Sequence, residues 1–324
     1  MTIEVPPLMP QAPKARAFTV STIPAWMAYA VSAAVCWGVW GVLSKGPSRE
    51  LSGWMTQVLF TFALAPSVAL ACLSKRVLVG TNRPLGLFWG FVSGLLAAAG
   101  NIFFYLALEA GADTSIAVPL TNVYPLVTIV LAFFVFKERL NLVQASGVVL
   151  ALVAITLLSG EAQNLGRPLE VLRRLGLKPW VIDSLAAMAC WGVFSATQKL
   201  STNHVSAELS YLAWSTAFVP IAIWIVATKP LNWQMSGPML ASGLAAGVLN
   251  GFGVVAAFAA YRFEGKASIV TPLAAALQPL VTVVLALLFL GERIGPLECM
   301  GIVLAIVAAI ALSRETKPRP GPAV

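Results

Sequence analysis

The feature that most constrains the fold is an internal repeat at an offset of 154 residues. The run Cys-Trp-Gly-Val at 36–39 recurs at 190–193, and the motifs that follow keep nearly the same register. The matched positions are Lys45 with Lys199, Pro66 with Pro220, Pro125 with Pro279, Glu138 with Glu292, and 147–159 with 301–313. Low-complexity apolar sequence rarely repeats Trp, Pro, Lys and Glu in one shared register. The chain is therefore two copies of one unit.

Each copy consists of long apolar segments that end at basic residues or at Gly, Pro and Asn clusters. Of the 324 residues, 59% are hydrophobic and 10% are charged, whereas soluble domains carry about 25% charged residues. One spanning helix needs about 20 largely apolar residues. The pattern predicts ten transmembrane helices, at 25–44, 53–73, 85–108, 114–136, 142–159, 180–198, 207–227, 237–261, 267–290 and 296–312.

Five spans in each copy is an odd number, so the second copy enters the membrane from the opposite face. The predicted fold is an all-α membrane protein with two inverted five-helix repeats. Two inverted copies can exchange conformations around a site at the membrane midplane, which is typical of secondary transporters. The expected segments are a disordered tail (1–24), the first repeat (25–159), a linker (160–179), the second repeat (180–313) and a short tail (314–324).

The distribution of basic residues predicts the orientation. Ten spans place both termini on one side, which collects thirteen of the 21 Lys and Arg residues, against eight on the other side. The positive-inside rule then puts both termini in the cytoplasm, for a protein of the inner (cytoplasmic) membrane. This topology also explains the net charge of +8 without nucleic acid as a partner. Four of the eight residues lie in the linker, which could form an interfacial amphipathic turn.

Prolines interrupt two predicted spans that occupy equivalent places in the repeats. They are Pro119, Pro125, Pro272 and Pro279. A proline inside a helix removes one backbone hydrogen bond and kinks the helix, so the carbonyls of Thr121 and Ala275 are expected to lose their usual partners. Polar side chains beside these breaks, among them Asn122, either line a transport pathway or satisfy the freed carbonyls.

Glycines at four-residue steps predict close helix crossings in 85–108 and 237–261. Asn101 follows Gly94 by seven residues, and Asn250 follows Gly243 by seven, so each amide is expected to face inward. Aromatic side chains lie in the middle of 25–44 and 180–198, where they either stack on a ligand or pack in the core. The candidate substrate-binding residues are Trp37, Trp40, Asn101, Tyr105, Asn122, Tyr124, Trp191, Phe194, Asn250 and Gln278.

Charged residues at the predicted helix ends are interpreted mainly as structural. Lys45 and Lys199 either snorkel to the headgroups or attract an anionic substrate. Glu138 and Glu292 lie in tight turns and are expected to cap the next helix or to pair locally. Four separated cysteines and the single His204 predict no metal site and no disulfide framework. Without a phosphate loop or a nucleophile motif, the chain is predicted to need no cofactor and not to be an enzyme.

These features resemble the drug/metabolite transporter superfamily, and specifically its EamA-like members, over about residues 25–313. The resemblance rests on the duplicated five-helix unit, on Trp37, Gly38 and Lys45, and on the proline-to-arginine stretches 125–139 and 279–293. It implies a ten-helix basket around a central cavity, with the fifth and tenth helices at the periphery. Family members often have Glu before the fourth- and ninth-span proline, whereas this chain has Tyr124 and Gln278.

The expected function is secondary transport, as an exporter or facilitator, of a small neutral or zwitterionic metabolite such as an amino acid. A neutral, polar and aromatic cavity suits that class of solute. A sugar permease of the same superfamily and a channel or lipid scramblase stay open as alternatives. The expected partners are the lipid bilayer and a small-molecule substrate, while coupling to protons or another ion and assembly as a homodimer stay open.

Overall fold

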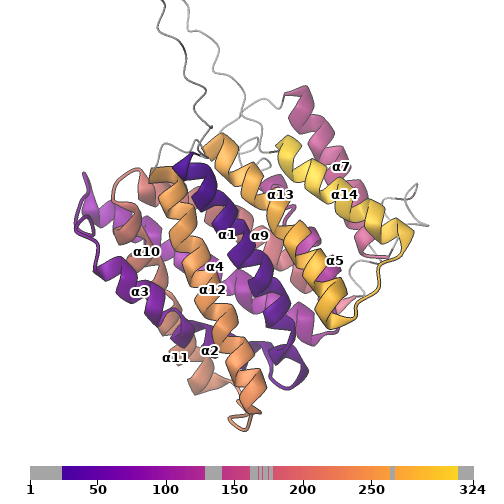
Figure 1. The fold of residues 1–324 in the computed structure, drawn as a ribbon, viewed down its shortest axis with the longest axis horizontal. Coiled ribbons are helices and arrows are strands. Elements are labelled where there is room, and N and C mark those ends of the chain that lie inside the picture. Colours follow the sequence, from indigo (N-terminus) through magenta and orange to yellow (C-terminus); the bar gives the residue numbers. More distant parts are fainter. Residues whose placement is uncertain are drawn as a thin grey trace, which may run out of the picture.

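The computed structural model describes residues 24–127, 141–160, 178–262 and 267–312, with Arg167, Glu170 and Arg174 between them. Both predicted tails and most of the predicted linker lie outside these ranges. The described residues are almost entirely helical, and their one β-bridge joins Gly80 to Val205. Figure 1 shows the helices as one bundle.

The first repeat contains six described helices and a short 3-10 turn, and the second repeat contains six described helices and a π-helical segment, η3. In the first repeat these are α1 (Ala25–Lys45), η1 (Pro47–Arg49), α2 (Gly53–Ala63), α3 (Ala65–Cys72), α4 (Arg83–Glu109), α5 (Thr114–Thr121) and α7 (Leu142–Leu158). In the second they are α9 (Pro179–Thr202), α10 (Ala207–Thr216), α11 (Phe218–Thr228), α12 (Gly237–Arg262), α13 (Ala267–Leu285), η3 (Ala286–Leu290) and α14 (Pro296–Leu312).

Seven helical segments of the described chain are long and apolar enough to cross a membrane. Two shorter apolar helices, α7 and α14, have 17 residues each and were expected to be the shortest spans. The predicted span 114–136 is described only as far as Val127, so its last part, 128–136, lies outside the described residues. The bounds of the other nine predicted spans agree with the helices to within four residues.

Two predicted spans are each divided into two helices. The segment 53–73 breaks at Leu64, between α2 and α3, and 207–227 breaks at Ala217, between α10 and α11. Each break comes shortly before a proline, Pro66 or Pro220. Proline has no N–H to continue the ladder, and its ring displaces the preceding turn. The two repeats therefore share a bend at equivalent positions.

Contacts within the first repeat give the relative direction of α1 and α4. Nε1 of Trp40 donates to the hydroxyl of Tyr105, at 3.2 Å. One turn further along α1, Nζ of Lys45 donates to the carbonyl of Ala112, just past the end of α4. Residue numbers rise together along the contact, so α1 and α4 run parallel.

Contacts between the repeats give the direction of α9. Gly86, near the start of α4, packs against Val205, just beyond the end of α9. Gly100, further along α4, packs against the ring of Trp191 in the middle of α9. From the first contact to the second, residue numbers rise along α4 and fall along α9, so these two helices are antiparallel. Since α4 is parallel to α1, the equivalent helices α1 and α9 point in opposite directions, and the repeats are inverted.

The two repeats pack through reciprocal helix pairs. The first helix of each, α1 or α9, lies against helices of the other: α1 against α12 and α13, and α9 against α4 and α5. The last helices, α7 and α14, pack against each other and lie side by side at one edge of the bundle (Figure 1). The first helix of each repeat therefore packs against two helices of the other repeat, and α7 and α14 lie at the edge of the bundle.

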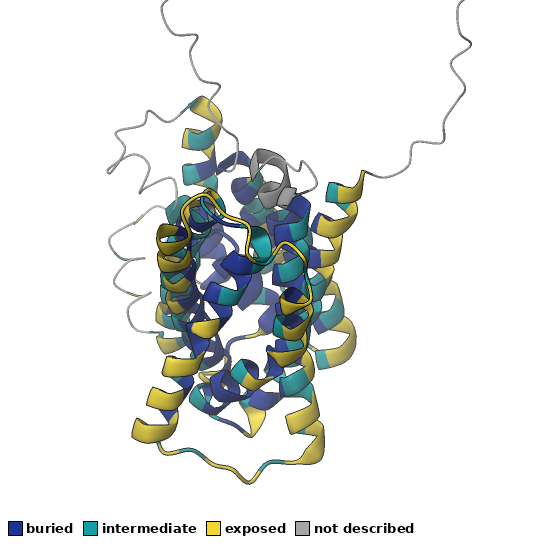
Figure 2. Ribbon diagram, turned by 90° about the vertical axis from the view of Figure 1, so that its left-hand side faces the viewer, coloured by how far each residue is buried: buried dark blue, intermediate teal, exposed yellow. Residues whose placement is uncertain are grey.

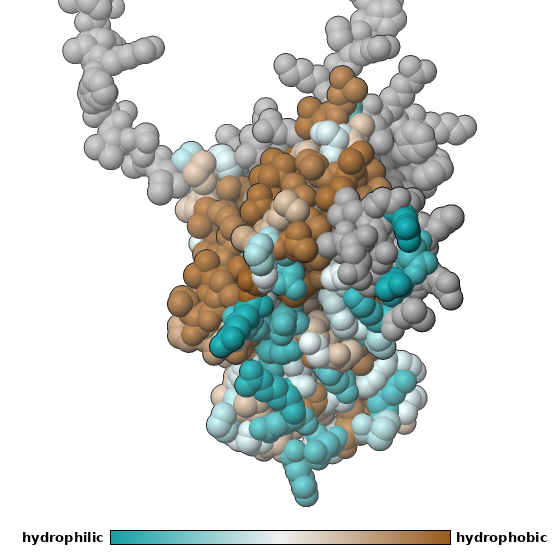
Figure 3. Space-filling model, turned by 90° about the vertical axis from the view of Figure 1, so that its right-hand side faces the viewer, coloured by the Kyte–Doolittle hydropathy of each residue, from teal (hydrophilic) through white to brown (hydrophobic). Residues whose placement is uncertain are grey.

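Burial follows this arrangement. Figure 2 shows buried residues in the interior of the bundle and exposed ones around it. Large apolar side chains cover parts of the outer surface, for example Leu288 at 70% and Phe289 at 75% exposure on η3. Figure 3 shows hydrophobic side chains grouped over one part of the outer face and hydrophilic ones over another. Apolar side chains on the outside of apolar helices are suited to contact with lipid.

Candidate functional site

The repeated Cys-Trp-Gly-Val motif forms the contacts between the repeats. On α1, the ring of Trp37 lies over Gly253 of α12, where a β-carbon would be 2.6 Å from Nε1 of the indole. Gly38 faces α13, where its own β-carbon would be 3.1 Å from the carbonyl oxygen of Gln278. Thr282, one turn further along α13, donates its hydroxyl to the carbonyl of Gly38 at 3.0 Å. We call these five residues the first junction.

The second motif makes the same contacts in the opposite direction. On α9, the ring of Trp191 lies over Gly100 of α4, where a β-carbon would be 2.4 Å from Nε1. A β-carbon on Gly192 would be 2.8 Å from the carbonyl oxygen of Tyr124, and 2.6 Å from Cβ of Val127. We call these residues the second junction. Close approach requires glycine at Gly38 and Gly192, since any side chain would meet the facing helix.

The junctions bring several predicted site residues together. Trp37 and Gln278 belong to the first junction, and Trp191 and Tyr124 to the second. Gln278 is 8% exposed, while Trp37, Trp191 and Tyr124 are half-buried. Tyr124 and Gln278, the residues before the prolines, thus occupy equivalent places beside the glycine of the opposite motif.

The proline-containing helices differ between the repeats. Helix α5 contains Pro119, ends at Thr121 and is followed by a turn through Asn122, before helical conformation resumes at Pro125. Helix α13 instead continues from Ala267 to Leu285 through both of its prolines. The expected break is therefore present in the first repeat, whereas α13 of the second repeat is one continuous helix. The side chain of Pro272 lies outside the described ones.

The expected loss of a partner for the carbonyl of Thr121 is wrong. Pro125 cannot donate to it, but the N–H of Tyr124 does so at 3.1 Å, because the chain tightens by one residue into a turn. The Nδ2 of Asn122 donates to the carbonyl of Val118 at 2.9 Å. The local backbone is thus satisfied without a ligand.

A group of aromatic side chains lies between α1, α4 and α9. The ring of Trp40 is 5.0 Å from that of Phe104 and 5.9 Å from that of Trp191. Trp40 and Tyr105 are 2% and 1% exposed and hydrogen-bond to each other. The mid-span aromatic side chains were expected either to stack on a ligand or to pack in the core. Trp40 and Tyr105 pack in the core, whereas Trp37, Trp191 and Phe194 are only half-buried.

Both candidate asparagines are buried, but they do not occupy equivalent places. Gly94 of α4 packs against Trp214 and Ala217, and Gly247 of α12 packs against Phe60 and Ala63, at the same repeat offset. Gly94 is therefore equivalent to Gly247 and not to Gly243. Asn101 directly follows the glycine beneath Trp191, whereas Asn250 lies one turn before the glycine beneath Trp37. Asn101 is 4% and Asn250 is 7% exposed.

Several buried polar atoms have no hydrogen-bond partner in the described structure. They include Nδ2 of Asn101, Oδ1 of Asn122, the hydroxyls of Thr114 and Ser115, and both amide atoms of Gln57. Gln57 is fully buried on α2 and was missed by the sequence analysis. An amide inside the apolar run 54–60 could have identified it, because a polar side chain within a span needs a partner there.

A charged group lies where α1 and α4 end and α5 begins. The carboxylate of Glu292 accepts the N–H groups of Thr114 at 2.9 Å and Ser115 at 2.8 Å. Glu292 therefore caps α5 of the opposite repeat, and the expected capping of the next helix is wrong. Lys45 donates to the carbonyl of Ala112, at 2.5 Å. Glu138 is the repeat equivalent of Glu292, and Lys199 is that of Lys45. Glu138 and the side chain of Lys199 lie outside the described residues.

No three His, Cys, Asp or Glu side chains of the described chain come together as metal ligands. Apart from buried Tyr and Trp, the buried polar side chains there are Ser, Thr, Asn or Gln. The arrangement can therefore offer a solute aromatic faces and uncharged donors and acceptors.

Comparison with known proteins agrees with the repeat. A family model described as "EamA-like transporter family" matches residues 24–160 and 178–314. An uncharacterized protein of Methanocaldococcus jannaschii is 38% identical over 87 residues, which cover 27% of this chain and 62% of that relative. The match thus spans less than two thirds of the relative's length. A solved structure described as "Crystal structure of protein" has a TM-score of 0.59 at 18% identity, covering 90% of this chain and 96% of that one, and shares the fold.

Proposed function

The chain belongs to the EamA-like transporter family, and from that premise we propose that it carries a small neutral or zwitterionic metabolite across the membrane. Transport would proceed by alternating access around a midplane site between the junctions, as export or facilitated diffusion. An amino acid is the solute class that we favour. The observation that carries the proposal is the pair of reciprocal junctions, which differ at α5 and α13.

Alternating access follows from that difference. Two inverted repeats that adopted the same conformation would give a symmetric bundle, open to neither side or to both. When the repeats adopt two conformations, the pathway opens to one side, and exchanging the two conformations opens it to the other. Here the broken α5 and the continuous α13 are the differing elements. We propose that they exchange conformations during the transport cycle.

The solute class follows from the buried polar groups. An unpaired amide or hydroxyl in an apolar interior costs free energy, which a polar ligand or water can offset. Nδ2 of Asn101 is an unpaired donor, and Oδ1 of Asn122 is an unpaired acceptor. No charged side chain is fully buried in the described part. A solute with both donors and acceptors and no net charge suits these groups better than an ion does.

The orientation belongs to the same proposal. We place the protein in the cytoplasmic membrane with both termini in the cytoplasm, on the basis of the distribution of Lys and Arg. Coupling to protons would add a driving force, which an imposed pH gradient can test.

Flux measurements in proteoliposomes test the proposal. A panel of amino acids, sugars and nucleosides is offered to the purified protein, and saturable uptake of an amino acid is expected. Replacing Trp37, Trp191, Asn101 or Gln278 by Ala should reduce that flux with folded yield unchanged. Trp233→Ala is the matched control, because Trp233 lies in the connection before α12 at 59% exposure.

Each alternative has a distinct outcome. If only sugars show saturable flux, the solute is a sugar and not an amino acid, and alternating access still holds. Discrete single-channel currents, or lipid flipping without saturable solute flux, would contradict alternating access. Unchanged kinetics in all four variants would remove the proposed lining.

A further inference from the structure

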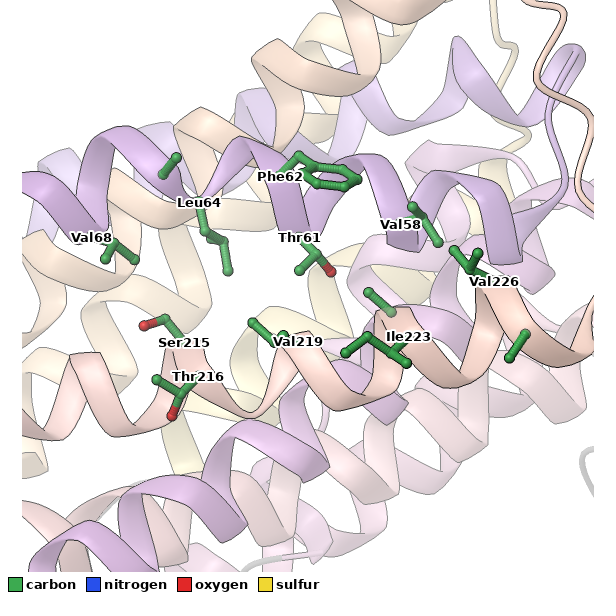
Figure 4. A pocket seen from close by; sticks show the side chains of 13 residues that line it. Val58, Thr61, Phe62, Leu64, Val68, Ser215, Thr216, Val219, Ile223 and Val226 are labelled. Atoms are coloured by element: carbon green, nitrogen blue, oxygen red, sulfur yellow. The ribbon is translucent and has the colours of Figure 1, made fainter.

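An apolar groove runs along the outside of the bundle between two equivalent helix pairs. One wall is α2 and α3, and the other is α10 and α11, as Figure 4 shows. Its volume is about 610 Å³. Thr61 and Ser215 are equivalent positions of the repeat and line opposite walls, as do Ala65 and Val219. The relation between the repeats therefore exchanges the two walls of the groove and also its two ends.

The lining has no free polar group to offer a ligand. The hydroxyls of Thr61, Ser215 and Thr216 all donate to carbonyls of their own helices, at 3.0, 2.9 and 2.8 Å. The other lining side chains are apolar, and Phe62 and Ile223 are 66% and 65% exposed. Both walls belong to candidate membrane spans. Hydrocarbon is the occupant that fills such a groove without leaving a polar group unpaired.

One end of the groove carries a cation between two indoles. Trp54 lies one turn before Val58, a lining residue of α2, and its ring is 5.8 Å from that of Trp224 on α11. Nζ of Lys229, which follows α11, lies 4.4 Å from the ring centre of Trp54 and 5.4 Å from that of Trp224. No carboxylate of the described chain pairs with Lys229. Trp and Lys at the end of a span are typical of the level of the lipid headgroups.

The opposite end of the groove differs in charge. At the repeat offset, Trp54 corresponds to Glu208, Trp224 to Leu70, and Lys229 to Lys75. Glu208 accepts a hydrogen bond from Ser74 at 2.9 Å, and Lys75 is exposed. An acid stands there in place of an indole. Only the end at Lys229 combines a cation with two aromatic rings.

We propose that this groove is a binding site for one anionic phospholipid. An acyl chain occupies the groove between α2–α3 and α10–α11, and the phosphate lies at Lys229 beside Trp54 and Trp224. The lipid belongs to the leaflet that meets the connection between α1 and α2. By filling the space between the two bent helix pairs, it joins the repeats on the outer surface.

Native mass spectrometry with added lipid tests this site. The purified protein is titrated with phosphatidylglycerol or with phosphatidylcholine, and the fraction that retains one lipid is measured. Phosphatidylglycerol should bind more tightly than phosphatidylcholine. Lys229→Gln should weaken its binding by about fivefold, as expected for one basic residue at the membrane surface. Lys75→Gln, the equivalent change at the other end, should leave binding unchanged.

A second variant separates the groove from the headgroup contact. Val219→Trp fills the groove and leaves Lys229 in place, so it should also reduce the retained lipid, with a thermal transition confirming that the variant is folded. Equal loss in Lys229→Gln and Lys75→Gln would overturn the proposal, because it would indicate general attraction to basic surface. Equal binding of the two lipids would also overturn it. So would a dimer, seen by ultracentrifugation, that Val219→Trp dissociates, since a second copy would then occupy the groove.

Discussion

The hydroxyl of Thr282 on α13 donates a hydrogen bond to the carbonyl oxygen of Gly38 on α1, at 3.0 Å. This is a side-chain bond between the two repeats in the first junction. The same hydroxyl is 3.1 Å from the carbonyl of Gln278, one turn earlier on its own helix. The bond therefore connects the repeated glycine motif to the residue that precedes Pro279.

Thr282→Val should destabilise the protein by about 1 kcal/mol, since valine keeps the shape and removes one buried donor. The measurement is the midpoint of thermal unfolding in detergent. Thr156→Val is the control, because Thr156 is buried on α7 and donates only within its own helix, to Leu152 at 2.8 Å. An equal loss in both variants would mean that the bond to Gly38 contributes nothing specific.

Glu292→Ala should destabilise the protein by about 0.5–2 kcal/mol, the usual range for loss of a helix cap. The two N–H groups at the start of α5 lose their acceptor, and the carboxylate no longer balances the helix dipole. Unfolding midpoints of Glu292→Ala and Glu292→Gln are compared, and Gln should retain part of the stability because its amide oxygen still accepts. Identical midpoints for wild type and Glu292→Ala would contradict the capping role.

Gln57→Leu should leave stability unchanged or increase it. Both amide atoms of Gln57 are buried without partners, so their removal costs no hydrogen bond and adds apolar volume. If a solute uses this amide, flux should fall in the same variant. A large drop in the unfolding midpoint would show that Gln57 has a structural partner.

Asp113→Asn should stabilise the protein slightly at neutral pH, by less than about 1 kcal/mol because the side chain is solvent-accessible. Partial burial raises the pKa of the Asp113 carboxyl above its usual value, and nearby Glu292 raises it further, while Lys45 lowers it. A raised folded-state pKa means that stability is lost as pH rises through it. The advantage of Asp113→Asn should therefore shrink as pH falls toward about 4. An advantage that grows in acid would contradict this sign.

The sequence predicted the family, the helical membrane fold and the repeat, because these depend on long apolar runs and on a register of rare residues. The match of the EamA-like model to both halves confirms the resemblance. The bounds of α1, α12 and α14 could be predicted because Pro, Gly, Lys and Arg mark their ends. The breaks at Leu64 and Ala217 were missed. Each lies inside a continuous apolar run, and the proline that follows it does not by itself show whether the helix ends or only bends.

Long-range features of the site were not accessible from spacing. The capping of α5 by Glu292 joins residues almost 180 positions apart, and only the packed structure defines it. Glycine steps predicted the close helix crossings, but they could not show that Gly94 is equivalent to Gly247, because Gly243 and Gly247 are both one helical turn from another glycine. The difference between α5 and α13 was also missed, since the two carry prolines at equivalent places.

The inverted repeat itself can be tested by labelling from one side of the membrane. Arg49 and Asn203 are equivalent, exposed positions just past the ends of α1 and α9. In a variant with the four native cysteines replaced, Arg49→Cys and Asn203→Cys are treated separately with a membrane-impermeant maleimide, on sealed right-side-out and inside-out vesicles. The account predicts that each cysteine reacts in only one vesicle type, and that the two react in opposite types. Reaction of both from the same side would contradict it.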